Sequence, residues 1–524
     1  MASTTSPVNG AHALLQTLAA NDVTVCFANP GTSEMHFVAG LDQVPAVRGV
    51  LCLFEGVATG AADGYARIAR RPAATLLHLG PGLGNGWANL HNARRARVPV
   101  LNIVGDHATY HGVFDAPLQS DLAALASALE GWYRRSTSSN DLPGDVADAL
   151  SGAYGPPNRV ATLVLPADVS WGDLTAAPTS WPLARRRAAQ PFDEQRLERA
   201  RRALRAGGAA LFIGGQLDED QLALARRVAD ATSSRLIVET FPTSLTRGAG
   251  VASAERLIYL SEFAQAQLRD LASLVVLGTT RPVGFFAYPN VASELVARDC
   301  DVIDLAPPGV DLNATLAALV AVTNAGALYV DAGEAPSAPS GALTPESFAA
   351  AVAATMPEDL IIADESNTSG LHLYGATRHC PPHELLTLTG GAIGFGLPVA
   401  VGAALAGARP VLALESDGSL LYTAQALWTM AREQLDVTVV ALANRGYAIL
   451  NLERQRVGAA AEGSASQRLL DLDDPTMDLA GLARSLGVPA HTVTTADELV
   501  TALRRSYATP GPTFIEAVLP TSRF

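Results

Sequence analysis

The fold is decided by residues 411–450, VLALESDGSLLYTAQALWTMAREQLDVTVVALANRGYAIL. The apolar run 411–414 is short and bounded by turn-forming residues, as expected for a buried parallel strand. The Asp-Gly-Ser turn at 417–419 leads into a helix with one regularly spaced apolar face, and 435–443 is predicted as the next strand. Strand, helix and strand in this order predict a βαβ unit of a parallel sheet.

Polar groups follow both strands of this unit, at the same edge of the predicted sheet. Ligands of parallel sheets bind beyond the carboxyl ends of the strands, where Asp417 supplies a carboxylate, Asn444 an amide oxygen and Gly446 a backbone carbonyl. Oxygen ligands that include only one charge suit a Mg²⁺ ion that also binds phosphate. A helix starting near Ser419 would direct free N–H groups at a diphosphate. The alternative is an ordinary βαβ unit in which Asp417 caps a helix.

A second candidate is Glu55, the lone carboxylate in GVLCLFEGVATGAADGYARIA, residues 49–69. It stands at the end of an apolar strand, where a helix is predicted to begin. Burial of an unpaired carboxylate costs several kcal/mol, so a functional partner is one interpretation. The other interpretation is an acid at a helix start, stabilised by the helix dipole.

Composition limits the classes of function. The chain has 524 residues, with 48% hydrophobic and 17% charged residues, which predicts roughly three globular domains. Its formal charge of −14 argues against a nucleic-acid or anionic-membrane partner. Four scattered cysteines without a CxxC pair predict reduced thiols in a cytoplasmic protein. No signal peptide is expected, and the weakly apolar run 390–408, which contains Pro398, is predicted as a buried helix near a ligand.

Alternating strand and helix patterns predict an α/β fold of three doubly wound, Rossmann-like domains with mainly parallel sheets. The domains are predicted at 1–180, 191–330 and 345–524, with Pro- and Ala-rich linkers between them. The predicted strands are 23–28, 49–54, 74–79, 98–104 and 160–165, then 210–214, 235–239, 274–278 and 301–305, then 411–414, 435–443, 490–494 and 512–519.

The motifs together resemble the thiamine-diphosphate (ThDP) dependent enzymes. Asp-Gly-Ser, followed after a helix and a strand by Asn-x-Gly, is similar to the ThDP motif, although Ser416 and Ala443 stand where many members have Gly and Asn. FANPGTSE, LFEGVATGAADGYAR, LHLGPGLGNG and TGGAIGFGLP also occur in family order. The chain resembles the branch of acetohydroxyacid (acetolactate) synthase large subunits, close to benzoylformate decarboxylase.

The resemblance implies a fold and an activity. The three domains would be a pyrimidine-binding, a central and a diphosphate-binding domain, with active sites between two subunits of a homodimer or, more usually, a homotetramer. The implied enzyme is a lyase or transferase that uses ThDP and Mg²⁺ to decarboxylate a 2-oxo acid through a ylide and an enamine. It would release an aldehyde or ligate a second carbonyl, as in acetolactate synthesis. The alternatives are a non-catalytic or regulatory ThDP-fold subunit and a ThDP lyase acting on a 2-hydroxyacyl substrate.

The resemblance also implies roles for individual residues. Glu55 matches the catalytic glutamate that bonds N1′ of the aminopyrimidine, and His78 matches the active-site histidine of benzoylformate decarboxylase. Thr32 stands where that enzyme has a substrate-binding serine, and Ile393 would bend the cofactor from beneath. The implied metal ligands are Asp417, Asn444 and Gly446. The implied cofactor-binding residues are Asn367, Thr368, Gly391, Ile393, Asp417, Gly418, Ser419, Asn444, Gly446 and Tyr447.

The second histidine of benzoylformate decarboxylase has no clear match. The corresponding region, TTRPVGFFAYPN, offers Phe285, Phe286 and Tyr288, whereas His107 and His111 fall loosely near the paired histidines of pyruvate decarboxylase. The proton donor, and with it the choice between decarboxylation and carboligation, stays open. The central segment carries no GxGxxG or other convincing dinucleotide fingerprint, which predicts a protein without FAD.

Overall fold

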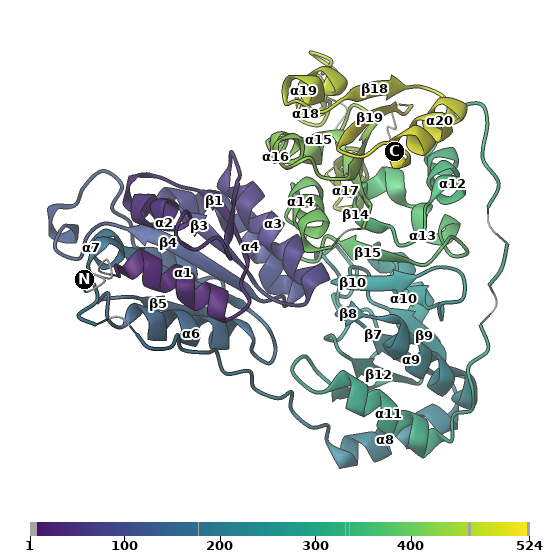
Figure 1. Cartoon of the computed structure of the whole chain (residues 1–524). Helices are drawn as coiled ribbons and strands as arrows, with labels where there is room; N and C mark the ends of the chain where they lie inside the picture. Colours follow the sequence, from purple (N-terminus) through teal and green to yellow (C-terminus); the bar gives the residue numbers. More distant parts are fainter. Residues whose placement is uncertain are drawn as a thin grey trace.

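The computed structural model describes residues 8–176, 178–330, 332–334, 336–407, 409–459 and 463–520. The first residues of the predicted range 1–180, the last of 345–524 and position 408 of the predicted helix lie outside these ranges. The described chain forms three sheets covered by helices. Figure 1 shows the N-terminal group of elements at the left and the central and C-terminal groups stacked at the right.

The N-terminal sheet has the strand order β2-β1-β3-β4-β6-β5, and all its pairs are parallel. Helices α1 and α6 pack on one face, and α3 and α4 on the other. The strands are β1 (Val25–Asn29), β2 (Arg48–Leu51), β3 (Ala73–Leu77), β4 (Val100–Asp106), β5 (Trp132–Arg135) and β6 (Val160–Pro166). The helices are α1 (Gly10–Ala20), η1 (Thr32–Glu34), α2 (Met35–Gly40), α3 (Glu55–Ala69), α4 (Leu79–Ala96), η2 (Gly112–Phe114), α5 (Leu122–Ser127), α6 (Leu142–Ala153) and α7 (Ala167–Trp171).

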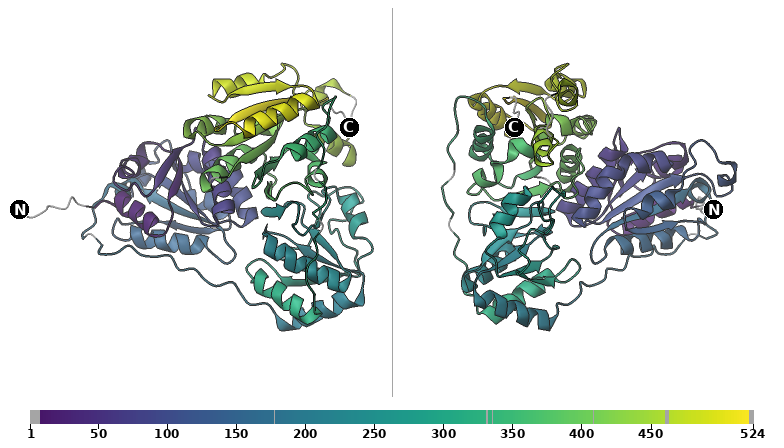
Figure 2. Two further views of the ribbon diagram at one scale, coloured as in Figure 1. Left: turned by 45° about the vertical axis from the view of Figure 1, so that its right-hand side comes forward. Right: turned by 180° about the vertical axis from the view of Figure 1, so that it is seen from behind.

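The central sheet is smaller, with the parallel order β11-β9-β7-β12-β13. Its strands are β7 (Ala209–Ile213), β9 (Arg235–Val238), β11 (Glu255–Arg256), β12 (Ser273–Leu277) and β13 (Asp301–Ala306). Its helices are α8 (Glu194–Ala206), α9 (Glu219–Thr232), α10 (Ser261–Leu268) and α11 (Leu312–Thr323). Figure 2 shows, from two further sides, that residues 178–193 cross from the N-terminal group to the central one as an extended connection.

The C-terminal sheet is the largest and has the order β18-β19-β17-β16-β14-β15-β10-β8. Its strands are β8 (Gln216–Leu217), β10 (Ser244–Arg247), β14 (Ile361–Glu365), β15 (His383–Thr387), β16 (Val411–Ser416), β17 (Val437–Ala443), β18 (Ala490–Val493) and β19 (Thr513–Val518). Its helices are α12 (Pro345–Thr355), η3 (Asn367–Gly370), α13 (Leu373–Ala376), α14 (Gly396–Ala406), α15 (Asp417–Leu420), α16 (Ala426–Glu433), α17 (Ala448–Arg456), α18 (Ser464–Gln467), α19 (Leu479–Ser485) and α20 (Ala496–Tyr507).

The predicted α/β class with mainly parallel sheets is confirmed, and one pairing departs from the pattern. Strand β10 lies in the segment predicted as the central domain, yet it pairs antiparallel with β15 and carries β8 with it into the C-terminal sheet. This addition covers the open edge of β15, where unpaired backbone groups would otherwise face solvent. The two parts of the chain therefore share a sheet.

The helix predicted after the Asp-Gly-Ser turn is broken in the structure. A single turn, α15, is followed by bends and turns before α16 begins at Ala426. The apolar residues on this segment keep their burial, because Leu420 and Leu427 both pack into the same core. The periodicity thus indicated the buried side correctly and missed the break.

Small residues let the N-terminal and C-terminal parts approach closely. Helix α3 packs along α14, and a Cβ atom on Gly402 would lie 1.9 Å from the carbonyl oxygen of Ala61. A Cβ on Gly64 would lie 2.1 Å from the carbonyl oxygen of Val399. Larger side chains would force the helices apart. This contact brings the start of α3, with Glu55, towards the loop that precedes α14.

The described residues include no helix that is long and apolar enough to span a membrane. All four cysteines are free and buried.

Candidate cofactor site

Asp417 and Asn444 follow neighbouring strands at one sheet edge. Strands β16 and β17 run parallel with Ser416 opposite Leu442, so both side chains leave the sheet at its carboxyl end. The Oδ2 atom of Asp417 accepts a 2.6 Å hydrogen bond from the backbone N–H of Arg445, next to Asn444. The turn after β17 is thereby attached to the turn after β16.

Burial raises the pKa of Asp417 to about 6, although the N–H groups of Arg445 and Gly418 oppose the rise. Its side chain is 2% exposed and has no cationic side chain bonded to it among the described residues. A buried carboxylate without a countercharge gains most from a nearby cation. The environment of Asp417 therefore fits a metal ion.

The donor set is one carboxylate, one amide and one backbone carbonyl. Hard oxygen ligands with a single charge fit Mg²⁺ that shares its remaining positions with phosphate and water. The described residues contain no group of three or more His, Cys, Asp or Glu side chains arranged around a metal. Among the predicted metal ligands, only Asp417 is a side chain of this kind. Binding of Mg²⁺ here would therefore depend on a ligand that supplies further oxygen atoms.

Several other predicted cofactor-binding residues lie at the same turn. The Tyr447 ring covers Gly418 so closely that a Cβ there would lie 2.5 Å from its Cε1 atom. Asn367 donates a 2.9 Å hydrogen bond from Nδ2 to Ser416, and Ser419 lies buried behind the turn. Because α15 is only one turn long, a diphosphate at this position would meet the N–H groups of the turn rather than a long helix dipole. Asn367 is exposed, Thr368 and Gly446 are half-buried, and Asn444 is buried.

Gly391 and Ile393 lie in the loop before α14, which Glu365 holds from beneath. The carboxylate of Glu365 accepts hydrogen bonds from the N–H groups of Gly394, Phe395 and Gly396, at 2.8, 2.8 and 2.7 Å. Its side chain is therefore turned into the protein. Gly391 has a φ of +74°, a backbone conformation that favours glycine.

Glu415 lies beside Glu365 on the adjacent strand, and both side chains are buried. Burial raises the pKa of Glu365 to about 7. Burial and repulsion by Glu365 raise the pKa of Glu415 well above its usual range. The pair therefore binds a proton more readily than ordinary carboxyl groups do, because a proton on one of them avoids two adjacent buried charges.

Glu55 begins α3 and is 8% exposed. Asn85, on α4, donates a 3.0 Å hydrogen bond from Nδ2 to Oε2 of Glu55. A Cβ on Gly82 would lie 3.2 Å from the other carboxylate oxygen, so the absence of a side chain there leaves room for Glu55. Asn85 is a hydrogen-bond partner of Glu55 that the sequence interpretation missed.

His78 is paired with a fully buried acid, Glu34. The distance from Nδ1 of His78 to Oε2 of Glu34 is 2.8 Å, and Gly31 and Ser33 also donate hydrogen bonds to this carboxylate. Glu34 fits because Gly105 of β4 has no side chain: a Cβ there would lie 1.5 Å from Oε1. Glu34 was missed, although an acid inside the FANPGTSE motif of a chain with few charges was a usable signal.

Thr32 and His78 line one cavity of about 320 Å³. His107, His111, Tyr110 and Trp171 also line it, so the loosely matched histidines lie in the same place. The rings of His107 and His111 are 5.2 Å apart, and the buried Nε2 atom of His107 has no hydrogen-bond partner among the described residues. Glu55 is not among the lining residues. A larger hollow of about 900 Å³, between α6 and residues 182–190, contains no predicted site residue.

Tyr288, one of the alternatives to a second histidine, is engaged elsewhere. Its ring stacks 3.8 Å from the guanidinium of Arg456, and burial together with Glu453 raises its pKa to about 12. Phe285 instead points at residues 389–394 before α14, a segment named the cofactor loop for its predicted role, since a Cβ on Gly391 would lie 2.6 Å from the Cζ atom of Phe285. Residues 279–290 therefore present aromatic rings to this loop and contain no acidic side chain.

The aromatic surface is a cluster of four rings. Phe285 lies 5.3 Å from Phe286, 5.5 Å from Tyr259 and 5.9 Å from Phe241, mostly edge to face. Such arrangements are favourable between aromatic rings. Phe285 and Phe286 remain exposed in the single chain.

The predicted site residues thus form two groups. Thr32, Glu55 and His78 lie in the N-terminal part, and the predicted metal and cofactor residues lie in the C-terminal part. Among the described residues, no hydrogen bond joins the first group directly to the second. The connection between them is made by other side chains of α3 and α4.

Family comparisons match both parts. Residues 8–125 match the family described as "Thiamine pyrophosphate enzyme, N-terminal TPP binding domain". Residues 368–517 match "Thiamine pyrophosphate enzyme, C-terminal TPP binding domain". The two matches cover the two groups of predicted residues, apart from Asn367 at the edge of the second.

Relatives match along the whole length. The chain is 53% identical to the "Putative acetolactate synthase large subunit IlvX" of Mycobacterium tuberculosis over 518 residues, which is 98% of this chain and 99% of that protein. It is 29% identical to a benzoylformate decarboxylase of Pseudomonas aeruginosa, covering 94% and 96% of the two chains. Its fold is similar to the ThDP-dependent 4-hydroxybenzoylformate decarboxylase of Rhodococcus jostii RHA1, with a TM-score of 0.84, 24% identity and coverage of 98% and 100%.

Proposed function

Because this chain belongs to the thiamine pyrophosphate (ThDP) enzymes, we propose that it decarboxylates a 2-oxo acid with ThDP and Mg²⁺. The fragment left after loss of CO₂ leaves as an aldehyde or is joined to a second carbonyl compound. The observation that carries this proposal is the pairing of buried Asp417 with Asn444 at the ends of β16 and β17. The Asp417 carboxylate, which has no countercharge, and the neighbouring Asn444 amide together suit a cation that holds a diphosphate.

Each group of residues has a role in the proposal. Asp417, Asn444 and the carbonyl of Gly446 hold Mg²⁺. Gly391 and Ile393 contact the rings of the cofactor, and Glu55 bonds the pyrimidine nitrogen. The proposed diphosphate residues are Asn367, Thr368, Gly418, Ser419 and Tyr447. ThDP held by these residues would supply a nucleophilic carbon and an electron sink for the decarboxylation.

The cavity at His78 supports a role in binding and proton transfer. Glu34 favours the tautomer with a proton on Nδ1 of His78, which leaves Nε2 as the basic nitrogen. Thr32 offers a hydroxyl to the substrate carboxylate. His107, with an unpartnered Nε2, is the proposed proton donor, since Tyr288 is engaged by Arg456.

The aromatic cluster supports an apolar substrate. Phe285 lies against Gly391, so a substrate bound above the cofactor loop would meet rings rather than charged groups. Burial of an apolar acyl group there is favourable by about 25 cal/mol per Å² of contact area. We therefore expect 2-oxo acids with bulky apolar groups to be preferred over pyruvate.

A complete site is proposed to need a second copy of the chain. Tyr110, Val113 and Phe114, beside the His78 cavity, are exposed apolar residues that a partner would cover. A homodimer, or a homotetramer built from two dimers, provides that cover. The four free, buried cysteines support a reducing compartment such as the cytoplasm.

The test is release of CO₂ from a panel of 2-oxo acids by protein loaded with ThDP and Mg²⁺. Release from at least one member, lost after chelation of the metal, is the expected result. Tight binding of ThDP without turnover of any 2-oxo acid would favour the non-catalytic or regulatory subunit. Cleavage of a 2-hydroxyacyl substrate without CO₂ release would favour the lyase alternative.

A further inference from the structure

The hollow of about 900 Å³ lies between α6 and the linker, here residues 181–190, away from the predicted site. One wall is a single side of α6, where the lining residues 144, 147, 148, 151 and 152 recur at helical spacing. The other wall is formed by linker residues between 182 and 190. This volume is near the upper end of the range for small-molecule sites, so the hollow has room for more than a single small ion.

Hydrogen bonds hold the linker in place along this wall. The Oδ1 atom of Asn21 accepts a 2.7 Å bond from the N–H of Ala184. The N–H of Arg185 donates a 2.8 Å bond to Oγ of Ser151, on α6. At the far end, the N–H of Gln190 donates a 2.8 Å bond to a carbonyl of the central part. The linker is therefore attached on both sides of the hollow.

The linker carries three consecutive arginines that have different surroundings. The Cζ atom of Arg186 lies 4.1 Å from the centre of the Tyr154 ring, and its guanidinium donates a 2.6 Å hydrogen bond to the Tyr154 hydroxyl. Successive side chains of an extended segment point to opposite sides, so Arg185 and Arg187 share the side away from this contact. Both of them line the hollow.

A third arginine, Arg159, lines the hollow from the segment between α6 and β6. The side chains of Arg159, Arg185 and Arg187 make no hydrogen bond or ion pair within the part of the chain that the structure describes. Asp148, the acid among the lining residues, already binds Arg134 at 2.8 Å. Uncompensated positive charge therefore gathers at one hollow of a chain whose formal net charge is −14.

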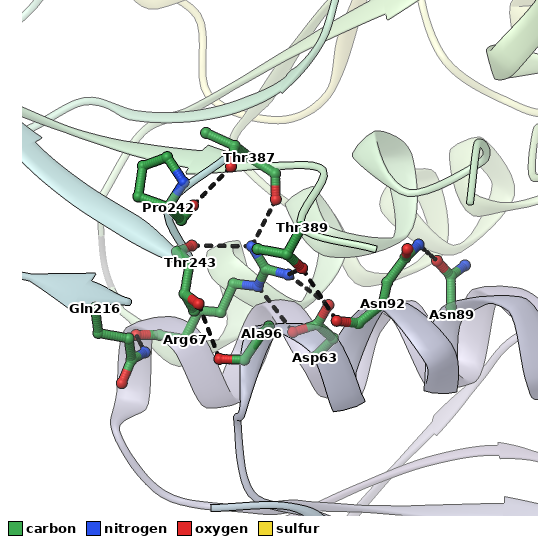
Figure 3. A network of polar contacts seen from close by, with 10 residues as sticks. All are labelled: Asp63, Arg67, Asn89, Asn92, Ala96, Gln216, Pro242, Thr243, Thr387 and Thr389. Atoms are coloured by element: carbon green, nitrogen blue, oxygen red, sulfur yellow. Dashed lines mark hydrogen bonds and ion pairs between the residues drawn. The ribbon is translucent and has the colours of Figure 1, made fainter. Parts of the chain in front are cut away.

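A different contact fastens the N-terminal part to the rest of the chain. The fully buried Arg67 of α3 donates to the carbonyls of Thr243 and Thr387 at 2.9 and 2.8 Å. Asp63 binds the same guanidinium through both carboxylate oxygens. Figure 3 shows this network, in which no residue of the linker takes part. The arginines that line the hollow are therefore available to a ligand.

We propose that this hollow binds a phosphorylated small molecule through Arg159, Arg185 and Arg187. The planar fork of a guanidinium matches phosphate oxygens, and one phosphate accepts bonds from more than one arginine. The small residues of α6 leave room for the rest of the ligand, since a Cβ on Gly144 would meet no further heavy atom within 4 Å.

The ligand of this hollow would be an effector rather than the substrate. None of the residues assigned to the 2-oxo acid reaction lines the hollow. A bound phosphate compound would connect the linker to α6 and so stabilise the docked linker. The inference does not depend on the proposed function, because it uses neither the cofactor nor the reaction.

The test uses protein saturated with ThDP and Mg²⁺, so that phosphate probes cannot enter the predicted cofactor site. Equilibrium dialysis measures binding of ADP, inorganic pyrophosphate and citrate at low salt. One saturable site per chain is expected for ADP, with an affinity that falls as salt is added. Tighter binding of ADP than of pyrophosphate would identify a nucleotide as the ligand, and equal affinities would identify a free polyphosphate. Tighter binding of citrate, or no binding of either phosphate compound, would overturn the proposal.

The double variant Arg185→Gln/Arg187→Gln is expected to weaken ADP binding by about 10²-fold, since each lost charge-assisted hydrogen bond costs about tenfold. Arg186→Gln is the matched control, because it removes the same charge on the side that faces Tyr154. It should change the affinity by less than about twofold. Equal weakening in the double variant and the control would overturn the site. Arg159→Gln, on the other side of the hollow, should weaken binding by about tenfold and decides the matter if the double variant does not fold.

Two further measurements do not rely on a change of charge. Gly144→Phe fills the open space beside α6 and is expected to abolish ADP binding. ADP should also slow amide hydrogen exchange in the wild-type peptide that covers 181–190. Within the described chain, the N–H groups of residues 186–189 have no hydrogen-bond partner, so they should exchange rapidly without ligand. Normal ADP binding by Gly144→Phe, or unchanged exchange in this peptide, would overturn the inference.

Discussion

His78 is held by Glu34: their Nδ1 and Oε2 atoms are 2.8 Å apart, and Glu34 is completely buried. The acid is in turn held by hydrogen bonds from Gly31 and Ser33. Because a buried carboxylate is stabilised by a neighbouring imidazole proton, the pair selects one tautomer of His78. His78 therefore enters the cavity with its orientation already determined.

Glu34→Gln is the first prediction. Glutamine keeps the shape but cannot stabilise the protonated ring, so kcat/KM for CO₂ release should fall by about 10²-fold with ThDP affinity unchanged. Steady-state kinetics of CO₂ release would show the loss. The exposed Glu358→Gln serves as control. Wild-type kinetics in Glu34→Gln would refute the role of the pair.

The second prediction concerns Glu55. Glu55→Gln can still bond the cofactor ring but cannot share a carboxyl proton with it, so exchange of the thiazolium C2 proton should slow by about 10²–10⁴-fold. ThDP binding depends on the diphosphate end and should largely survive. Quenched-flow NMR and calorimetry measure the two quantities. Unchanged exchange of the C2 proton in Glu55→Gln would mean that Glu55 only stabilises the start of the helix.

The third prediction is that Asp417→Ala abolishes retention of ThDP. Without this carboxylate the diphosphate would lose its bridging cation. Calorimetry with and without Mg²⁺ measures the effect, and the exposed Asp220→Ala should bind as the wild type does. If Asp417→Ala binds ThDP as tightly as the wild type in the presence of Mg²⁺, the metal assignment is wrong.

The fourth prediction is that the purified protein is colourless, because the central segment carries no convincing dinucleotide fingerprint. Absorbance at roughly 450 nm, where a bound flavin would be seen, is the measurement. A stoichiometric flavin spectrum would contradict it.

The fifth prediction links pH to stability through His383. Burial lowers the pKa of His383 from 6.5 to about 4, and its Nδ1 atom donates to the carbonyl of Pro381. Because the unfolded chain binds this proton more readily, the stability is fully present above pH 6.5 and is lost as pH falls towards 4. The loss is roughly 3 kcal/mol. His383→Gln should flatten this limb of the stability curve.

Urea unfolding at several pH values tests the prediction, with the exposed His491→Gln as control. As pH falls from 6.5 towards 4, the free energy of unfolding of the wild type should fall by roughly 3 kcal/mol more than that of His383→Gln. An identical acid dependence in both proteins would mean that His383 keeps its ordinary pKa in the folded state.

The sequence by itself determined the local features of this protein. The apolar runs that became β16 and β17, and the polar residues Asp417 and Asn444 that follow them, were visible because strands of a parallel sheet end at one edge. The position of Glu55 at a helix start was visible for the same local reason. The predicted roles of these residues remain proposals.

The tertiary structure alone decided which distant groups meet. It paired Glu34 with His78, moved β10 into the C-terminal sheet, turned Glu365 beneath the cofactor loop and joined that loop to α4 through Asn92. These contacts depend on helix packing and strand register across domains, and no spacing along the chain encodes them. A periodic pattern indicates which face of an element is buried, but the partner on that face is selected by the packing of the whole chain.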